Sequence, residues 1–324
     1  MSIDYKKAGV DISRGEEVVH RIKKILGKRG SDIGHFGGAI PIPIEGNEKL
    51  LLVSSIDGVG TKISIAKAMN KYDTIGADLV HHSVNDLMCC GAEPIAFMDY
   101  VASSKLDVDV IEDVLKGIIN SCDQLDIRLI GGETAEMPGV YIPGEIDLVG
   151  AIYGFVKEKD FIDGSKIKQD DVMLAFPSTG LHTNGYSLAR KILEMNDIRV
   201  DDRIDGTDKK WGEGLLAVHR CYRDEICHLM KSGFLKGIAH ITGGGIFSNT
   251  SRIIPKDLTP NFDWDSWEIP LIFKELIRYG NVDIEEARRV FNLGVGLVVI
   301  VDPNSVETLL EELDCFVIGN IDSK

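Results

Sequence analysis

The chain lacks any apolar run near the length of about 20 residues that crosses a bilayer, so no membrane-spanning segment is expected. Residues 1–7 contain no apolar core, which argues against a secretory signal there. The six cysteines include no C-x-x-C pair, the spacing of many zinc and redox motifs. Reduced thiols in a cytoplasmic protein are therefore expected.

Basic residues are also scarce, since 36 Lys and Arg stand against 51 Asp and Glu, for a formal net charge of −15. This charge repels polyanions and no basic stripe interrupts it, so a nucleic-acid partner is not expected. A small phosphorylated ligand is still compatible, because backbone amides, one lysine and Mg²⁺ can hold phosphate locally. No G-x-S-x-G sequence occurs, which disfavours a serine nucleophile.

What the chain does have is 324 residues with 44% hydrophobic content, enough for more than one ordinary core. Both halves mix strand-like and helix-like runs, which predicts two domains of α+β or mixed α/β type. The polar stretch 157–171 separates them, and we place the domains at 1–160 and 161–324. Strands are expected at 50–55, 94–102, 125–130, 146–156, 172–176 and 295–301, and helices at 14–29, 73–90, 107–122, 186–195 and 214–232.

Residues 131–139 (GGETAEMPG) follow an expected strand and combine three glycines with Glu133 and Glu136. Glycine reaches positive φ and lets ligands approach the backbone, so this composition predicts a shaped loop. Two carboxylates in such a loop are well placed to hold a metal ion, which can in turn hold phosphate. A solvated surface turn is the alternative interpretation.

Residues 55–62 (SIDGVGTK) form a second glycine-bearing segment after a strand. The amides of Gly58 and Gly60 and the ammonium of Lys62 would meet nucleotide phosphates, and the Asp57 carboxylate would meet Mg²⁺. The spacing and order differ from those of a Walker A loop. A tight hairpin turn is the alternative.

The expected helix 73–90 carries Asp78, His82 and Asp86 at i, i+4 and i+8, which places them along one face. A solvated polar stripe is one interpretation of this pattern. A metal site is the other, with oxygen ligands that suit Mg²⁺ better than zinc. The neighbouring His81 is expected to be structural or at the surface.

Two further loops come at expected strand ends. Residues 178–187 (STGLHTNGYS) precede a helix, where hydroxyls and free amides bind anions, and His182 can polarise a carbonyl or move a proton. Capping of the helix by Asn184 or Ser187 is the alternative role. Residues 240–245 (HITGGG) predict a backbone close to phosphate, or a plain tight turn.

The combination of these segments resembles the phosphoribosylformylglycinamidine cyclo-ligase family, also called aminoimidazole ribonucleotide synthetases. The motifs G-G-E-T-A-E-M-P-G and H-x-N-G-Y-S are the most specific parts of the match. The resemblance covers nearly the whole chain in the family's order. The matching segments are 5–12, 55–62, 85–87, 91–94, 131–139, 181–187, 240–245 and 291–296.

The resemblance implies ATP-dependent closure of the imidazole ring of formylglycinamidine ribonucleotide, giving 5-aminoimidazole ribonucleotide, ADP and phosphate in purine biosynthesis. Phosphorylation of the amide oxygen converts a poor leaving group into phosphate, which an internal nitrogen then expels. The resemblance further implies an N-terminal half that forms a barrel across the two-fold axis of a homodimer, with ATP near the interface, and a C-terminal α/β domain.

Carried over by motif, the resemblance makes Asp57, Asp86 and Glu133 candidates for binding Mg²⁺. It assigns no catalytic role to His81 or His82. The candidates for catalysis are Asp86, Glu133 and His182; for ATP contact, Asp57, Gly58, Gly60, Lys62 and Lys23; and for substrate contact, His182, Asn184, Gly244 and Gly245.

Related ATP-using enzymes are the main rivals to this interpretation, namely formylglycinamidine synthetase, thiamine-phosphate kinase, selenophosphate synthetase and a hydrogenase-maturation dehydratase. The chain encodes no glutaminase, and no cysteine precedes Cys89 where a selenophosphate synthetase would need a reactive one. A nucleotide-binding regulatory subunit without turnover is the non-catalytic alternative. The presence of all four candidate residues argues against it, namely Asp57, Asp86, Glu133 and His182.

Overall fold

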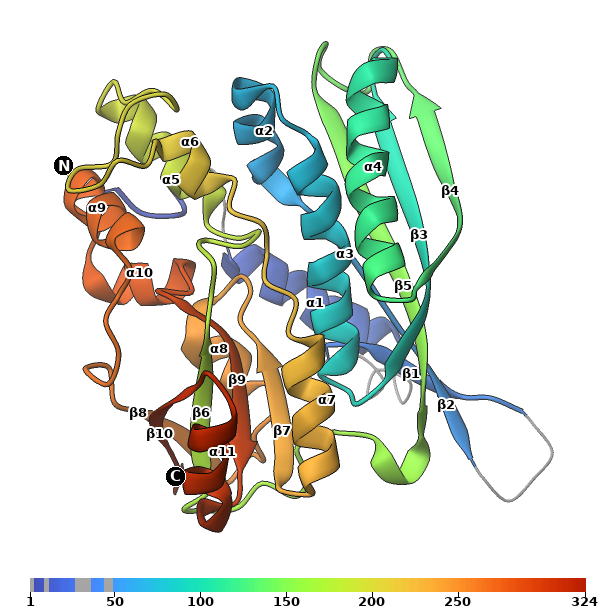
Figure 1. Ribbon diagram of the computed structural model, residues 1–324, viewed down its shortest axis with the longest axis vertical. Coiled ribbons are helices and arrows are strands. Elements are labelled where there is room, and N and C mark those ends of the chain that lie inside the picture. The colour runs from blue at the N-terminus through green and yellow to red at the C-terminus, as the bar shows by residue number, and fades with distance from the viewer. Residues whose placement is uncertain (1–2, 9–11, 27–35, 44–48) are drawn as a thin grey trace.

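The computed structural model describes residues 3–8, 12–26, 36–43 and 49–324. This part of the chain forms two five-stranded sheets, one from each half. The protein therefore has a mixed α+β fold with two domains. Figure 1 shows the first sheet with its helices on one side of the molecule and the second sheet on the other. In the part described, no helix is long and apolar enough to cross a membrane.

The first sheet has the order β1-β2-β5-β3-β4. Its strands pair antiparallel except β3 with β4, which run parallel. Two helices, α3 (Asp73–Met88) and α4 (Val108–Gln124), cover one face. The strands are β1 (Gly38–Pro41), β2 (Leu50–Gly58), β3 (Glu93–Ser103), β4 (Arg128–Glu136) and β5 (Ile146–Lys157).

Glycines let α3 and α4 cross at close range. A Cβ on Gly76 would overlap the carbonyl oxygen of Val114, and a Cβ on Gly117 would overlap that of Asp73. The expected start of α4 is confirmed, because the Asp107 side chain accepts hydrogen bonds from the first backbone N–H groups of the helix. The tight crossing fixes where α3 lies against the sheet.

The second sheet has the order β7-β9-β6-β10-β8, with antiparallel pairs throughout. Every residue of β9, an interior strand between β7 and β6, is buried, as its continuous apolar run predicts. The strands are β6 (Val172–Pro177), β7 (Leu235–His240), β8 (Leu258–Phe262), β9 (Val295–Val301) and β10 (Phe316–Ser323). The remaining helices are α1 (Ile12–Leu26), α2 (Ile63–Met69), α5 (Tyr186–Met195), α6 (Trp211–Leu215), α7 (Arg223–Ser232), α8 (Gly245–Ser251), α9 (Leu271–Gly280), α10 (Ile284–Val290) and α11 (Val306–Glu312).

The structure corrects two local predictions. Residues 131–136 are not a loop, because β4 continues through them to Glu136 and pairs with β3. The helix expected at 214–232 is two helices, α6 and α7, separated by a segment at 216–222 that is neither helix nor strand. The boundary at 160/161 stays a prediction; the first sheet ends at Lys157 and the second begins at Val172.

Candidate active site

The polar face of α3 lies in the interior, between the first sheet and the second domain. Asp78, His82 and Asp86 are 0%, 3% and 6% exposed, so the interpretation as a solvated stripe is wrong. Burying charged groups is costly unless they are paired and hydrogen-bonded, so their partners define what this face does.

The first of these groups, Asp78, forms an ion pair with Lys62 at 2.7 Å. The Lys62 Nζ also donates to the carbonyl of Ala217 at 2.7 Å, and Asp78 accepts from the backbone N–H of His219. Both side chains of the pair are fully buried. The predicted contact of Lys62 with ATP therefore does not fit this structure, in which its ammonium joins the two domains.

Further α3 side chains bind the segment 216–222 that connects α6 and α7. The Asn85 amide donates to the Arg220 carbonyl at 2.8 Å, and its oxygen accepts from the Tyr222 N–H at 2.9 Å. The His81 Nδ1 lies 2.6 Å from the His219 carbonyl, which confirms a structural role for His81. These bonds satisfy backbone groups that a helix or sheet would otherwise pair, so the segment 216–222 needs neither.

A triad of charged groups lies next to the contact between α3 and segment 216–222, which we call the seam. The His82 Nε2 is 2.9 Å from Asp57 at the end of β2 and 3.4 Å from Asp86. Burial opposes the charged form of His82, but the two carboxylates outweigh it and raise its pKa to about 10. His82 in turn lowers the pKa of Asp57 and Asp86 despite their burial.

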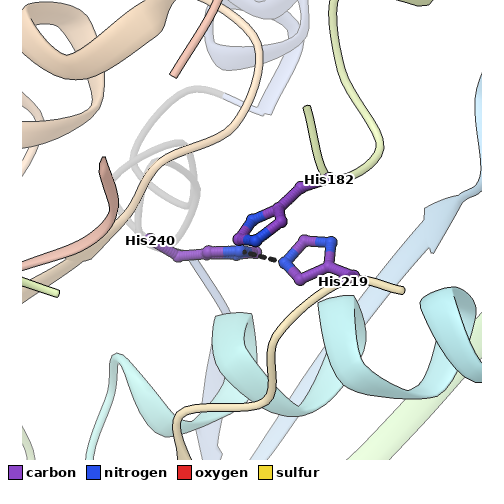
Figure 2. Close-up of side chains that lie close together, drawn as sticks. All are labelled: His182, His219 and His240. Atoms are coloured by element: carbon purple, nitrogen blue, oxygen red, sulfur yellow. Dashed lines mark hydrogen bonds between the residues drawn. The ribbon is translucent and has the colours of Figure 1, made fainter. Parts of the chain in front are cut away.

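Three histidines of the second domain continue the network, as Figure 2 shows. The His240 Nδ1 lies 2.7 Å from Asp86, and its Nε2 lies 2.8 Å from the Nε2 of His219. The His182 ring stacks on His219 with centroids 3.9 Å apart. Burial lowers the pKa of all three rings, so they are neutral near pH 7.

Sequence analysis missed most of this cluster. His82 was given no catalytic role, and yet it contacts both Asp57 and Asp86. His240 precedes the glycine loop 241–245, and that position at a strand end is a signal that was available. No local pattern marks His219, because its partners come from α3 and β7.

The His182 ring does not face open space, against the prediction that it contacts substrate. Its side chain is fully buried, and its Nε2 accepts the backbone N–H of Thr179 at 3.2 Å. The ring therefore fixes the loop that carries Thr183 and Asn184. Thr183 in turn contacts the cluster, since its Oγ1 lies 2.7 Å from the Nδ1 of His82.

The glycine loops of the two domains meet at this loop. Gly60 lies against the Thr183 backbone, and the Thr61 hydroxyl is 3.1 Å from that of Ser187. The Asn184 side-chain oxygen lies against Gly243, next to the start of α8. Neither Asn184 nor Ser187 caps α5, whose N-cap is Gly185 without a side-chain bond. The capping interpretation is therefore wrong.

Gly244 and Gly245, the predicted substrate contacts, both have positive φ, at 99° and 73°. A Cβ on Gly245 would also overlap the Arg288 carbonyl. These positions require glycine for conformation and space, whatever ligand the loop binds.

Glu133 does not join Asp57 and Asp86 within one chain. The strand register runs from Gly58 through Val149 and Tyr100 to Glu133, about 14 Å across three strand spacings. Alternation along β2 and β4 places Glu133 on the open face and Asp57 on the α3 face. The prediction of one metal site from all three carboxylates is therefore wrong for the isolated chain.

Two other predicted residues have a different outcome. Glu136 accepts the Leu106 N–H at 2.8 Å and so stabilises the turn before α4. Lys23 lies in α1, and its side chain is outside the described part of the structure.

The remaining pair, Asp57 and Asp86, meets at His82. The Nε2 of His82 lies 2.9 Å from Asp57 and 3.4 Å from Asp86. The Asp57 side chain is 49% exposed, which leaves this side of the pair open to a ligand. Carboxylate oxygens are ligands that Mg²⁺ accepts.

Comparison with known families assigns both domains. Residues 38–156 match the family model described as AIR synthase related protein, N-terminal domain, and residues 168–324 match that of the C-terminal domain. The chloroplastic phosphoribosylformylglycinamidine cyclo-ligase of Arabidopsis thaliana is 43% identical over 312 residues, which cover 96% of this chain and 78% of the relative. The corresponding protein of Carboxydothermus hydrogenoformans is 44% identical over 330 residues, with 98% and 96% covered.

Solved structures share the fold at low sequence identity. Thiamine monophosphate kinase from Aquifex aeolicus superposes with a TM-score of 0.64 at 15% identity, covering 95% of this chain and 94% of that one. The hydrogenase maturation protein HypE of E. coli gives 0.62 at 16% identity, covering 84% and 80%. The identity above 40% with the cyclo-ligases is far more specific. The chain therefore belongs to the AIR synthase related family, among the phosphoribosylformylglycinamidine cyclo-ligases.

Proposed function

We propose that the protein closes the imidazole ring of formylglycinamidine ribonucleotide to give 5-aminoimidazole ribonucleotide, with ATP converted to ADP and phosphate. The observation that carries this proposal is the meeting of Asp57 and Asp86 with the glycine loops of both domains, in a chain 43% identical to a cyclo-ligase. The reaction belongs to purine biosynthesis, and we expect it to take place in the cytoplasm.

The chemistry requires activation of an amide oxygen, which is a poor leaving group. Transfer of the ATP γ-phosphoryl group to that oxygen gives an iminophosphate, and attack by the internal nitrogen then expels phosphate. Asp57 and Asp86 would hold Mg²⁺, which would supply positive charge for the transferring group. The neighbouring Gly60 amide binds ATP phosphate in this proposal. The predicted phosphate contact of Gly58 competes with a bond inside the chain, because the Gly58 N–H donates to the Asp57 carboxylate at 2.7 Å.

In this proposal the second domain binds the substrate. Asn184 lies against Gly243, so its amide and the loop at Gly244 and Gly245 form one polar surface. Neutral His182 stabilises its own loop, because its Nε2 accepts a hydrogen bond from the Thr179 N–H. In this arrangement His182 acts as a positioning residue, and Asn184 makes the direct contact.

The proposal includes a homodimer that covers the open face of the first sheet. Ile40, Ile56 and Met98 lie on that face and are 59%, 71% and 37% exposed, an apolar surface that a partner would bury. Glu133 shares this face, so it would serve at the dimer interface rather than beside Asp57. Sedimentation at micromolar concentration should give a dimer, and Ile56→Glu should shift it toward monomer. A monomeric wild type would refute this assembly.

The direct test is turnover of formylglycinamidine ribonucleotide with ATP and Mg²⁺, followed as aminoimidazole ribonucleotide formation. Thiamine phosphate serves as the competing substrate, because kinases that act on it share the fold. Ring closure without phosphorylation of thiamine phosphate supports the proposal. Phosphorylation of thiamine phosphate with no ring closure at high enzyme concentration would overturn it.

A further inference from the structure

A cavity of about 630 Å³ lies outside the candidate active site, where the two domains join. Its walls are the start of β3, the end of β5, residues 159–166, α7 and the start of β7 (Figure 1). Among the described residues that line it, none belongs to the candidate active site. Sites for small molecules typically have volumes of about 300–1,000 Å³, so the cavity is large enough for one.

Positive charge gathers at this cavity, although the chain has a formal net charge of −15. In the whole sequence 51 acidic residues outnumber 36 basic ones, and at the cavity the balance is reversed. A local concentration of ammonium groups attracts anions to a protein that repels them elsewhere. The charged lining consists of five lysines and three acidic residues, namely Lys157, Lys159, Lys166, Lys231, Lys236, Glu93, Asp160 and Asp163.

Groups outside the cavity neutralise one charge of each sign. Glu93 forms an ion pair with Arg223 at 2.8 Å. Lys236 forms ion pairs with Asp171 at 2.5 Å and with Asp302 at 3.2 Å. The rest of the charged lining is then four lysines and two carboxylates, so the excess of positive charge is unchanged.

Three of these lysines are available to a ligand. Within the described part of the chain, the ammonium groups of Lys159, Lys166 and Lys231 form no ion pair or hydrogen bond. All three residues are exposed, so their side chains can turn toward an anion without giving up a partner. Lysine binds phosphate as a point charge, which makes phosphate a suitable anion for this cavity.

Apolar side chains form the other part of the lining. Phe155, Phe161, Ile162 and Leu235 all line the cavity and are partly buried. Aromatic and aliphatic side chains of this kind pack against flat rings. A bare inorganic anion would leave this apolar surface in contact with water, whereas a ligand with a ring would cover it. The lining therefore suits a ligand that joins phosphate to a planar ring.

We propose that this cavity binds a phosphorylated small molecule with a planar ring, of the nucleoside monophosphate class. The inference goes beyond the proposed function, because it concerns a second site. The walls are attached to both sides of the seam. The Ile162 N–H donates to the Cys90 carbonyl, just after α3, at 3.1 Å, and α7 begins directly after segment 216–222. A ligand bound here stabilises the folded chain across the domain junction.

Binding of AMP tests the inference, with adenosine and inorganic phosphate as matched partial probes. The full-length protein is titrated with each compound by calorimetry at the same ionic strength. AMP should bind at least about tenfold more tightly than either partial probe, because only AMP uses both the lysines and the apolar lining.

Charge-reversal variants locate the AMP. The double variant Lys166→Glu/Lys231→Glu should weaken AMP binding at least about tenfold, because it reverses two charges of the lining. The matched control is Lys105→Glu/Lys209→Glu, which changes the net charge equally at two exposed lysines outside the cavity. Lys105 follows the opposite end of β3, and Lys209 precedes α6. The control should bind AMP as wild type does.

Thiol alkylation gives a second reading of location. Cys227 lines the cavity and is partly buried, and Cys315, before β10, is equally partly buried but outside the cavity. Saturating AMP should slow the reaction of Cys227 with iodoacetamide, followed by peptide mass spectrometry. The rate at Cys315 should not change.

Three results would overturn the inference. One is the absence of AMP binding, and another is equal affinity for AMP and inorganic phosphate, since charge alone would then account for binding. The third is AMP binding that is unchanged in Lys166→Glu/Lys231→Glu and leaves Cys227 unprotected. That result would place the AMP at the proposed ATP site alone, and it would leave the cyclo-ligase proposal intact.

Discussion

Replacing Lys62 by methionine should strongly destabilise the protein. The Lys62 ammonium has two partners at 2.7 Å, the Asp78 carboxylate and the Ala217 carbonyl, and neither charged side chain has solvent contact. Burial lowers the pKa of Lys62 and raises that of Asp78, and the attraction between them opposes both shifts. Methionine fills a similar volume and leaves the Asp78 charge without its counter-ion.

Removal of one partner from a buried ion pair costs about 3–5 kcal/mol. The matched control is Lys67→Met, because Lys67 forms a pair with Glu145 at 2.8 Å in which the side chains are 43% and 40% exposed. An exposed pair contributes about 0–1 kcal/mol. The two variants therefore differ by at least about 2 kcal/mol if burial decides the effect.

The measurement is urea unfolding at pH 7, with the buried Trp211 as fluorescence probe and circular dichroism as a second signal. Lys62→Met/Asp78→Asn should be less destabilised than the sum of its single variants, because the second change removes the unpaired charge. At temperatures where Lys62→Met is folded, its ATP affinity should match that of wild type. A loss no larger than that of Lys67→Met, or ATP binding abolished in folded Lys62→Met, would show that Lys62 serves the nucleotide instead.

Three further predictions concern the site and the fold. Asp86→Asn should lower kcat for ring closure at least about a hundredfold, since electrostatic losses in phosphoryl transfer reach that size; near-normal turnover would remove Asp86 from the site. The pKa of His82 is raised from 6.5 to about 10, so its stabilisation is complete below pH 6.5 and is lost as pH rises toward 10. Urea unfolding in EDTA should show this alkaline decline in wild type, and an equal decline in His82→Gln would contradict it. Gly117→Ala should lower the free energy of unfolding by about 1–3 kcal/mol because its Cβ meets the Asp73 backbone, whereas an unchanged midpoint would mean that the helices separate freely.

Elements with a strong local pattern were predictable from sequence. Helix α5 and strand β9 have the expected bounds, because an amphipathic repeat and a continuous apolar run each determine one structure. The start of strand β4 was predicted, but its continuation through residues 131–136 was not, since three glycines in residues 131–139 indicate a loop. Its pairing with β3, a tertiary contact, overrides that local preference.

The candidate site was predictable where a motif carries its own chemistry. Asp57 and Asp86 were found in this way, and both lie within 3.4 Å of the His82 Nε2. The polar face of α3 was ambiguous, because the same spacing occurs on solvated and on buried helices. His219 and Lys62 have partners that only the folded chain brings near, so no pattern in their own segments revealed their roles.

The seam between α3 and segment 216–222 has a consequence for how ligands reach the site. Backbone groups of His219, Arg220 and Tyr222 depend on α3 side chains for their hydrogen bonds. A hinge motion that parted the domains would have to break all of these hydrogen bonds together. We therefore expect ligand access to depend on the loops at 58–62, 179–185 and 241–245 rather than on parting of the domains. Turnover in this enzyme would then be gated by short glycine-rich loops rather than by domain closure.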